Sequence, residues 1–130
     1  MKLKLIKGVV LAGIFLGAMP AAADNYAARH IALTEAFTRE MSRVGGGDQS
    51  WTVPTEMAVK MTCAIGELER RRGVPVVEEY LRWSAWAVEE AGKLQGVEGF
   101  GTLISQIHIR SGIDFDDDLG PITDVCGIGL

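Results

Sequence analysis

Residues 75–95 read PVVEEYLRWSAWAVEEAGKLQ, and this stretch fixes the fold class. Its apolar and small residues recur every three or four positions, so on a helix they share one broad face: Val76, Val77, Tyr80, Leu81, Ser84, Ala87, Val88, Ala91 and Leu94. Proline suits the first turn of a helix, early glutamates suit the positive end of its dipole, and Gly96 provides a stop. The pattern predicts an amphipathic helix with Trp83 at the edge of its buried face.

Two further amphipathic helices are predicted before this one. Residues 26–44 stop at a run of three glycines and carry an apolar stripe made of Tyr26, His30, Leu33, Phe37, Met41 and Val44. Residues 54–72 run from a proline to a glycine, and their apolar face consists of Met57, Met61, Ala64, Ile65 and Leu68. Three arginines at the end of the second helix suit the negative end of its dipole.

The pattern weakens after Gly96. Residues 102–110 fit helical spacing, although the alternation at residues 107–110 also fits a short strand, and we favour a helix. The tail from Gly112 is rich in aspartate and reads as loop, with one turn from Pro121 that presents a cysteine. The fold class predicted is therefore all-α, a small bundle of three to four helices with one disulfide.

Residues 1–23 have the three parts of a cleavable export signal. Three lysines precede an uncharged, mostly apolar run at residues 8–19, and a proline with three alanines follows it. The apolar run is about twelve residues long, whereas a membrane-spanning helix needs about twenty. We expect cleavage between Ala23 and Asp24, which makes the mature protein periplasmic or secreted. The alternative is an uncleaved membrane anchor.

Residues 24–130 fit one helical domain. The net charge changes from −4 to −7 when the three lysines of the signal are removed. An acidic protein of this size repels phosphate backbones and anionic lipid surfaces, so we expect no nucleic-acid partner. No later segment is apolar enough to span a bilayer, so we expect no membrane association after signal cleavage.

The two cysteines, Cys63 and Cys126, predict one structural disulfide, because an exported protein meets an oxidising compartment. Closing a loop of about sixty residues stabilises a fold by about 4 kcal/mol in the chain-entropy model. Cys63 falls on the opposite side of its helix from the apolar face, near Val59. We therefore expect the bond to hold the tail against the back of that helix, away from the core.

Catalytic chemistry finds little support in the residues. His30 and His108 are the two histidines, and neither adjoins a nucleophile motif. His30 lies in an apolar stripe, where a partly buried core role is expected. The glutamates fall on charged helix faces, and the glycine run at residues 45–47 lacks the lysine of a phosphate loop. We expect no enzyme and no cofactor.

The aspartate run is the nearest approach to a metal motif. Asp114, Asp116 and Asp118 stand at alternate positions, as in calcium loops. The glycine comes one place late, at Gly120, and the position of the bidentate glutamate is Val125. We therefore favour a solvated acidic loop, with weak binding of a divalent cation as the alternative.

Trp86 is predicted to project from the charged side of its helix, which is unusual for a large aromatic residue. With Trp83 it would form an aromatic ridge flanked by charges of both signs, and the candidate partner surface is Glu79, Arg82, Trp83, Trp86 and Glu90. Aromatic residues are enriched at the centres of protein interfaces. The alternative is that a later segment covers Trp86.

These observations favour an exported, non-enzymatic protein that binds a protein partner, of the accessory, inhibitor, immunity or chaperone type. The alternative is a periplasmic protein that binds a small ligand or a divalent metal ion.

Overall fold

The computed structural model describes residues 25–129, and the regular secondary structure in this range is helical, with no strand. The first helix spans residues 25–45. The later elements are α2 (Thr55–Arg72), α3 (Val74–Ala91), α4 (Glu98–Ser111), the π-helical segment η1 (Phe115–Leu119) and α5 (Gly120–Cys126). The prediction of an all-helical chain is confirmed, with one more helix than expected.

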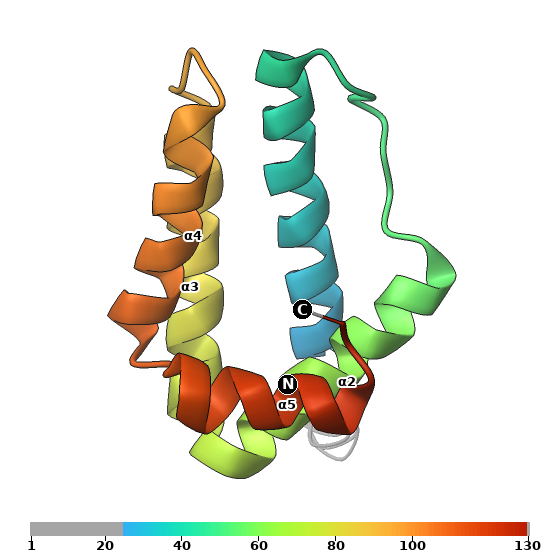
Figure 1. Ribbon diagram of the computed structural model, residues 1–130, viewed down its shortest axis with the longest axis vertical. Coiled ribbons are helices and arrows are strands. Elements are labelled where there is room, and N and C mark those ends of the chain that lie inside the picture. Colours follow the sequence, from blue (N-terminus) through green and yellow to red (C-terminus); the bar gives the residue numbers. More distant parts are fainter. Residues whose placement is uncertain (1–24, 130) are drawn as a thin grey trace, which may run out of the picture.

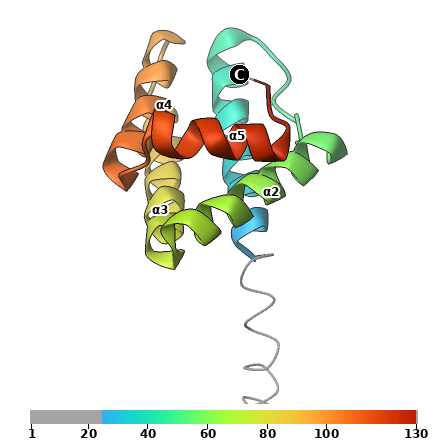
Figure 2. The same cartoon turned by 60° about the horizontal axis from the view of Figure 1, so that its bottom comes forward.

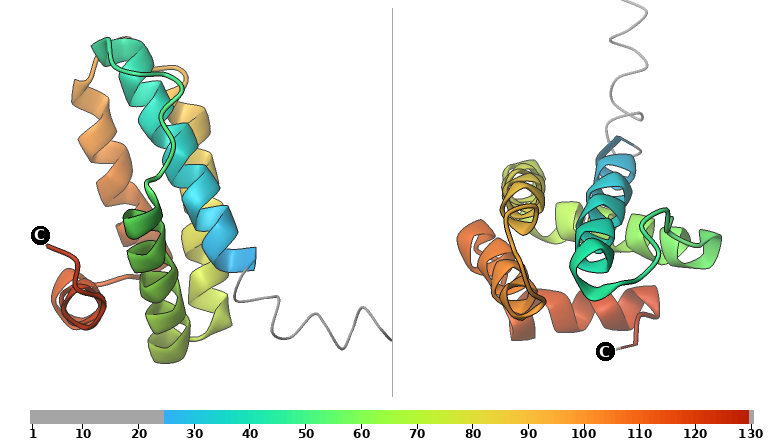
Figure 3. Two further views of the ribbon diagram at one scale, coloured as in Figure 1. Left: turned by 90° about the vertical axis from the view of Figure 1, so that its right-hand side faces the viewer. Right: turned by 90° about the horizontal axis from the view of Figure 1, so that it is seen from above.

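The helices form an upright group standing on a crossed base. The first helix, α3 and α4 run side by side, whereas α2 and α5 cross beneath them at one end (Figures 1 and 2). Seen from above, α2 and α5 lie across the lower ends of the three upright helices (Figure 3). The loop before α2 descends beside the first helix (Figure 1), so the chain returns to the base before α2 begins.

Glycines in the left-handed region allow two of the sharp changes of direction. Gly73 has φ 88° between α2 and α3, and Pro75 follows within the first turn of α3. Gly112 has φ 73°, and its N–H donates to the carbonyl oxygens of His108 and Ile109, which closes the end of α4.

Two clusters of buried side chains make up the core. The basal cluster lies where α2, α3 and α5 meet: Tyr26, Ile65, Leu68, Val77, Leu81, Ile113 and Ile122. The upper cluster joins α3 and α4 through Ala87, Ala91, Phe100 and Leu103, and Phe37 of the first helix packs against it. The rings of Phe37 and Phe100 meet edge to face, with centroids 5.4 Å apart.

Polar side chains of the first helix fasten its upper part. Arg43 donates to the carbonyl oxygens of Ala91, Gly92 and Leu94 at 3.1–3.3 Å, where the end of α3 leaves carbonyl groups without helical partners. Arg39 Nε donates to the Trp51 carbonyl oxygen at 2.9 Å, which holds the descending loop against the same helix.

Three expectations need correction. The third helix ends at Ala91 and not near residue 95, and α4 begins earlier than residue 102, at Glu98. The tail forms η1 and α5 where a loop with a single turn was expected. Its apolar residues Ile113 and Ile122 are buried in the basal cluster, and this packing orders a segment whose local sequence favours a loop. The open choice at residues 107–110 is settled as helix.

The predicted signal peptide, residues 1–23, lies outside the described residues. Among the helices at residues 25–129, none combines the length and the apolar character that crossing a membrane requires.

Candidate functional site

The principal candidate site is a groove between the first helix and α4, with α3 as its floor. The cavity measures about 250 Å³. The first helix contributes His30, Leu33, Thr34, Phe37, Thr38 and Met41. The other two helices contribute Tyr80, Ser84, Ile104, Ile107 and His108. None of these residues is an aspartate, glutamate, lysine or arginine.

Three rings form a row along the groove. The His30 and Tyr80 ring centroids lie 5.4 Å apart in an edge-on arrangement, and the Tyr80 and His108 centroids lie 6.0 Å apart. Each ring comes from a different upright helix, so the row depends on the packing of all three. Thr34 and Thr38 add hydroxyl groups to the wall, one and two turns after His30 on the first helix.

The groove is electrically neutral near pH 7. Burial lowers the pKa of His30 to about 4, because a charged imidazole would lose its hydration. Burial also lowers the pKa of His108, partly offset by a hydrogen bond to the backbone of Ile104. Burial raises the pKa of the Tyr80 hydroxyl to about 12. All three rings can therefore hydrogen-bond to a ligand without carrying charge.

A second, smaller cavity of about 60 Å³ shares two lining residues with the groove, His30 and Tyr80. Its remaining lining is aliphatic and comes from α2, α5 and the segment between α4 and α5: Ala64, Ile65, Leu68, Ile113, Leu119 and Ile122. The His30–Tyr80 pair therefore separates the groove from a small cavity that is otherwise lined by aliphatic side chains.

The serine that lines the groove is not placed as a nucleophile. Ser84 donates its hydroxyl hydrogen to the carbonyl oxygen of Tyr80, 2.7 Å away on its own helix. The hydroxyl is therefore not held against an imidazole, as nucleophilic activation requires. His30 lies partly buried at the edge of the core, as the apolar stripe predicted.

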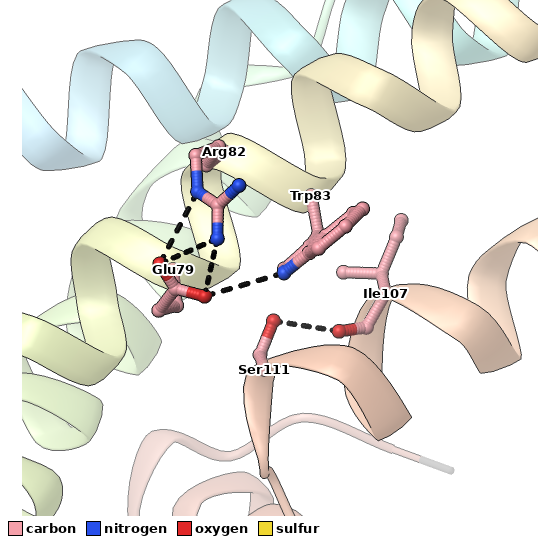
Figure 4. A network of polar contacts seen from close by, with 5 residues as sticks. All are labelled: Glu79, Arg82, Trp83, Ile107 and Ser111. Atoms are coloured by element: carbon pink, nitrogen blue, oxygen red, sulfur yellow. Dashed lines mark hydrogen bonds and ion pairs between the residues drawn. The ribbon is translucent and has the colours of Figure 1, made fainter.

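The predicted partner surface on α3 is largely paired within its own helix. Glu79 accepts hydrogen bonds from Arg82 at 2.6 Å and from the indole nitrogen of Trp83 at 3.3 Å (Figure 4). Glu90 pairs with Lys93 at 2.9 Å. These contacts hold the charged side chains along α3 in one row.

Trp86 is neither fully exposed, as an aromatic ridge would require, nor fully covered by a later segment. It is half-buried against the upper cluster. Its ring meets that of Trp83 edge to face, with centroids 5.6 Å apart. The Arg110 guanidinium of α4 stacks on both rings, 4.6 Å from the Trp83 centroid and 4.7 Å from that of Trp86. The tryptophan pair therefore joins α3 to α4, and only part of it faces solvent.

The three aspartates of the weak metal candidate make different contacts. Asp118 is buried and forms an ion pair with Arg72 of α2, and it also accepts a hydrogen bond from the Asp114 backbone at 2.8 Å. Asp114 accepts from the backbone of Asp117, while Asp116 is exposed. Within residues 25–129, no group of three or more histidine, cysteine, aspartate or glutamate side chains is placed to hold a metal ion.

The sulfur atoms of Cys63 and Cys126 lie at disulfide distance, and their Cα atoms are 5.7 Å apart. The pairing agrees with the prediction, but its surroundings differ. Cys126 packs against the basal cluster, and Ile122 of the same helix is buried in it. The bond therefore fastens α5 over the core, and the expectation that it holds the tail away from the core is wrong.

The groove itself was not predicted, although the first helix carries a signal for it. His30, Thr34 and Thr38 follow one another at intervals of four residues, which lines three polar side chains along the edge of an apolar stripe. Such a row in an otherwise apolar face indicates a wall that meets something other than a closed core.

Comparisons with models of known protein families, with curated proteins and with solved structures find no match for this chain.

Proposed function

We propose that this chain is an exported, non-enzymatic binding protein that holds small, uncharged, mostly apolar molecules in the groove between the first helix and α4. The observation that carries the proposal is the neutral lining: eleven residues without a carboxylate, ammonium or guanidinium group, and two histidines kept uncharged by burial. Concave, mainly apolar sites with a few convergent polar groups are the usual form of ligand pockets.

Export rests on the sequence of residues 1–23 and is in keeping with a cysteine pair at disulfide distance. Intact mass spectrometry of the protein recovered from the periplasm or the medium checks it. The mass should begin at Asp24 and be two hydrogens below that of the dithiol. A mass that retains residue 1, or two free thiols, would contradict export with cleavage.

Binding is tested with 1-aminoanthracene, an uncharged fluorescent probe of apolar cavities. Thr38→Asp places a carboxylate on the groove wall, where desolvation disfavours both the charge and the ligand. Probe affinity should fall at least about tenfold, equivalent to about 1.4 kcal/mol. Ala28→Asp is the matched control, because it adds the same charge to an exposed position of the same helix.

The two variants separate the groove from the rest of the surface. Equal probe affinities for native protein, Thr38→Asp and Ala28→Asp would mean that the probe binds elsewhere, and the proposal would fail. Circular dichroism of each variant verifies that a loss of binding is not a loss of helix.

A protein partner is the second candidate function. The observation in its favour is the half-exposed Trp83–Trp86 pair beside the Glu79–Arg82 and Glu90–Lys93 ion pairs on α3. Co-purification from the native compartment, compared between native protein and Arg82→Glu, tests it. A partner retained by native protein and lost in the folded variant would place the interface on α3, whereas equal recovery by both would remove that surface.

A further inference from the structure

The aromatic rings that line the groove lie at two levels. The rings of His30, Tyr80 and His108 are in contact, with centroids 5.4 and 6.0 Å apart, and they form the level nearer the base. The first helix rises from the base (Figure 1), and Phe37 follows His30 on it by seven residues and lines the same groove. An α-helix rises about 1.5 Å per residue, so the two levels are about 10 Å apart along this helix.

A small side chain forms the floor of the groove between these two levels. Ser84 stands one turn after Tyr80 on α3, lines the groove and is buried. Aromatic rings pair at centroid separations of about 4.5–7 Å. A flat ring placed over Ser84, about 5 Å from each level, would therefore meet an aromatic ring on both sides.

The volume of the groove suits a molecule of one or two rings. An apolar cavity of about 150 Å³ is enough to bind benzene. The groove measures about 250 Å³.

The groove also has hydroxyl groups that are not bonded along their own helix. Thr62, Ser84 and Ser111 each donate to the carbonyl oxygen four residues earlier. Within the part of the chain that the structure describes, Thr34 and Thr38 of the groove wall make no such bond. Their hydroxyl groups are available to a polar group on a ligand.

We propose that the groove holds a flat aromatic molecule of one or two rings with one uncharged hydrogen-bonding group, in the manner of a phenol or an indole. One ring lies over Ser84, between the three contacting rings and Phe37. The hydroxyl or N–H group faces Thr34 and Thr38. This assignment rests on the proposed function, because it names the ligand class of that same groove.

The test compares 2-naphthol with decahydro-2-naphthol, which has the same carbon skeleton and hydroxyl group but no aromatic ring. Binding of each to the native protein is measured by isothermal titration calorimetry at pH 7. The saturated compound has more apolar surface, so burial alone would favour it. Contacts with rings on both sides should reverse this order, and 2-naphthol should bind at least about fivefold more tightly, equivalent to about 1 kcal/mol.

Ser84→Leu tests the position of the ring, because the larger side chain would occupy the space over α3. The affinity for 2-naphthol should fall at least about tenfold. Ser84→Ala is the matched control, since it removes the same hydroxyl group but leaves the space open. Its affinity should stay within about twofold of native.

Phe37→Leu provides an independent test if Ser84→Leu does not fold. It keeps an apolar side chain in the wall but removes the ring of the upper level. The preference for 2-naphthol over decahydro-2-naphthol should be lost, because one of the two ring contacts is gone. Circular dichroism verifies that each variant retains its helices.

Failure of this inference differs from failure of the proposed function. If 1-aminoanthracene binds in the groove but 2-naphthol binds no more tightly than decahydro-2-naphthol, the aromatic assignment is overturned and the groove remains a binding site. Native affinity for 2-naphthol in folded Ser84→Leu, or an unchanged preference in Phe37→Leu, would overturn the position of the ring. If 1-aminoanthracene does not bind in the groove, both proposals fail together.

Discussion

The base of the molecule and the groove above it are built in opposite ways. At the base, α2 and the C-terminal segment are joined by the cysteine pair and by the Arg72–Asp118 ion pair, and Ile122 is buried between them. In the groove, the first helix and α4 face a cavity of about 250 Å³ lined by uncharged residues. Specific contacts hold the base together, whereas the groove is lined by side chains that face an open cavity.

On the proposed function, stability and ligand binding are largely the tasks of different parts of one small chain. A link such as Cys63–Cys126 acts on the unfolded chain as much as on the folded one, and it needs no ligand. The residues that line a cavity lack the packing contacts that a filled core would give them. The structure around the groove therefore depends on other regions for its stability. Substitutions at the base should therefore change unfolding strongly, and substitutions in the groove should change binding first.

The largest effect is expected from removing the covalent link at the base. Replacing Cys63 and Cys126 together by alanine should lower the free energy of unfolding by about 4 kcal/mol, because 63 residues separate the two cysteines. Urea unfolding followed by circular dichroism measures the change. A loss below about 1 kcal/mol would mean that the ion pair and the apolar contacts hold α5 by themselves.

The next effect concerns the ion pair beside that link. Arg72→Met leaves the Asp118 carboxylate, whose side chain is 4% exposed, without its guanidinium partner. We expect a loss of about 3 kcal/mol, since breaking a buried pair strands the remaining charge. Arg71→Met is the matched control, because Arg71 is exposed on the same turn of α2. Similar losses in the two variants would show that the arginines act through the helix dipole alone.

In the groove, the uncharged state of the histidines predicts a pH dependence. His30 has a pKa of about 4 in the folded protein and about 6.5 when unfolded. The unfolded chain therefore binds the proton first as pH falls. The contribution to stability is complete above about pH 6.5 and is lost progressively towards pH 4.

The contribution of His30 to the free energy of unfolding should be about 2 kcal/mol. This is less than the full pKa shift implies, because the ring is only partly enclosed. Urea unfolding at pH 7.5, 5.5 and 4.0 measures it in native protein and in His30→Leu. The variant should retain only the smaller dependence due to His108, whose pKa burial also lowers. Identical pH profiles for the two proteins would mean that the His30 ring is hydrated in the folded state.

How far the sequence predicts this structure depends on whether a feature is local. The first helix, α2 and α3 follow from apolar spacing and from the glycines and prolines at their ends, which act within a few residues. The cysteine pair follows from composition. The helical tail and the groove cannot be predicted in this way, because they depend on which side chains meet across the fold.

The burial of Ile113 and Ile122, for example, is defined only when α2 lies beside the tail. The same limit explains Trp86. A helical wheel of α3 places Trp86 on the charged side, but the ring packs against the upper cluster and the guanidinium that covers it belongs to α4. A pattern within one helix carries no information about a guanidinium group supplied by another.

The smallest effect tests that contact at the join between α3 and α4. Arg110→Leu removes the guanidinium from the faces of Trp83 and Trp86, and we expect a loss of about 1 kcal/mol, the usual scale of cation–π contacts near a surface. Unfolding in urea followed by circular dichroism measures it without relying on the altered tryptophans.

Lys93→Leu is the control for Arg110→Leu, because Lys93 follows the end of α3, pairs with the nearby Glu90 and is largely exposed. Its loss should stay within about 0.5 kcal/mol. Equal effects of the two variants would mean that Arg110 leaves the indoles free in solution, and the aromatic pair would then be available to a partner. A clear excess for Arg110→Leu would assign the tryptophan pair to the fold and leave the groove as the candidate binding site.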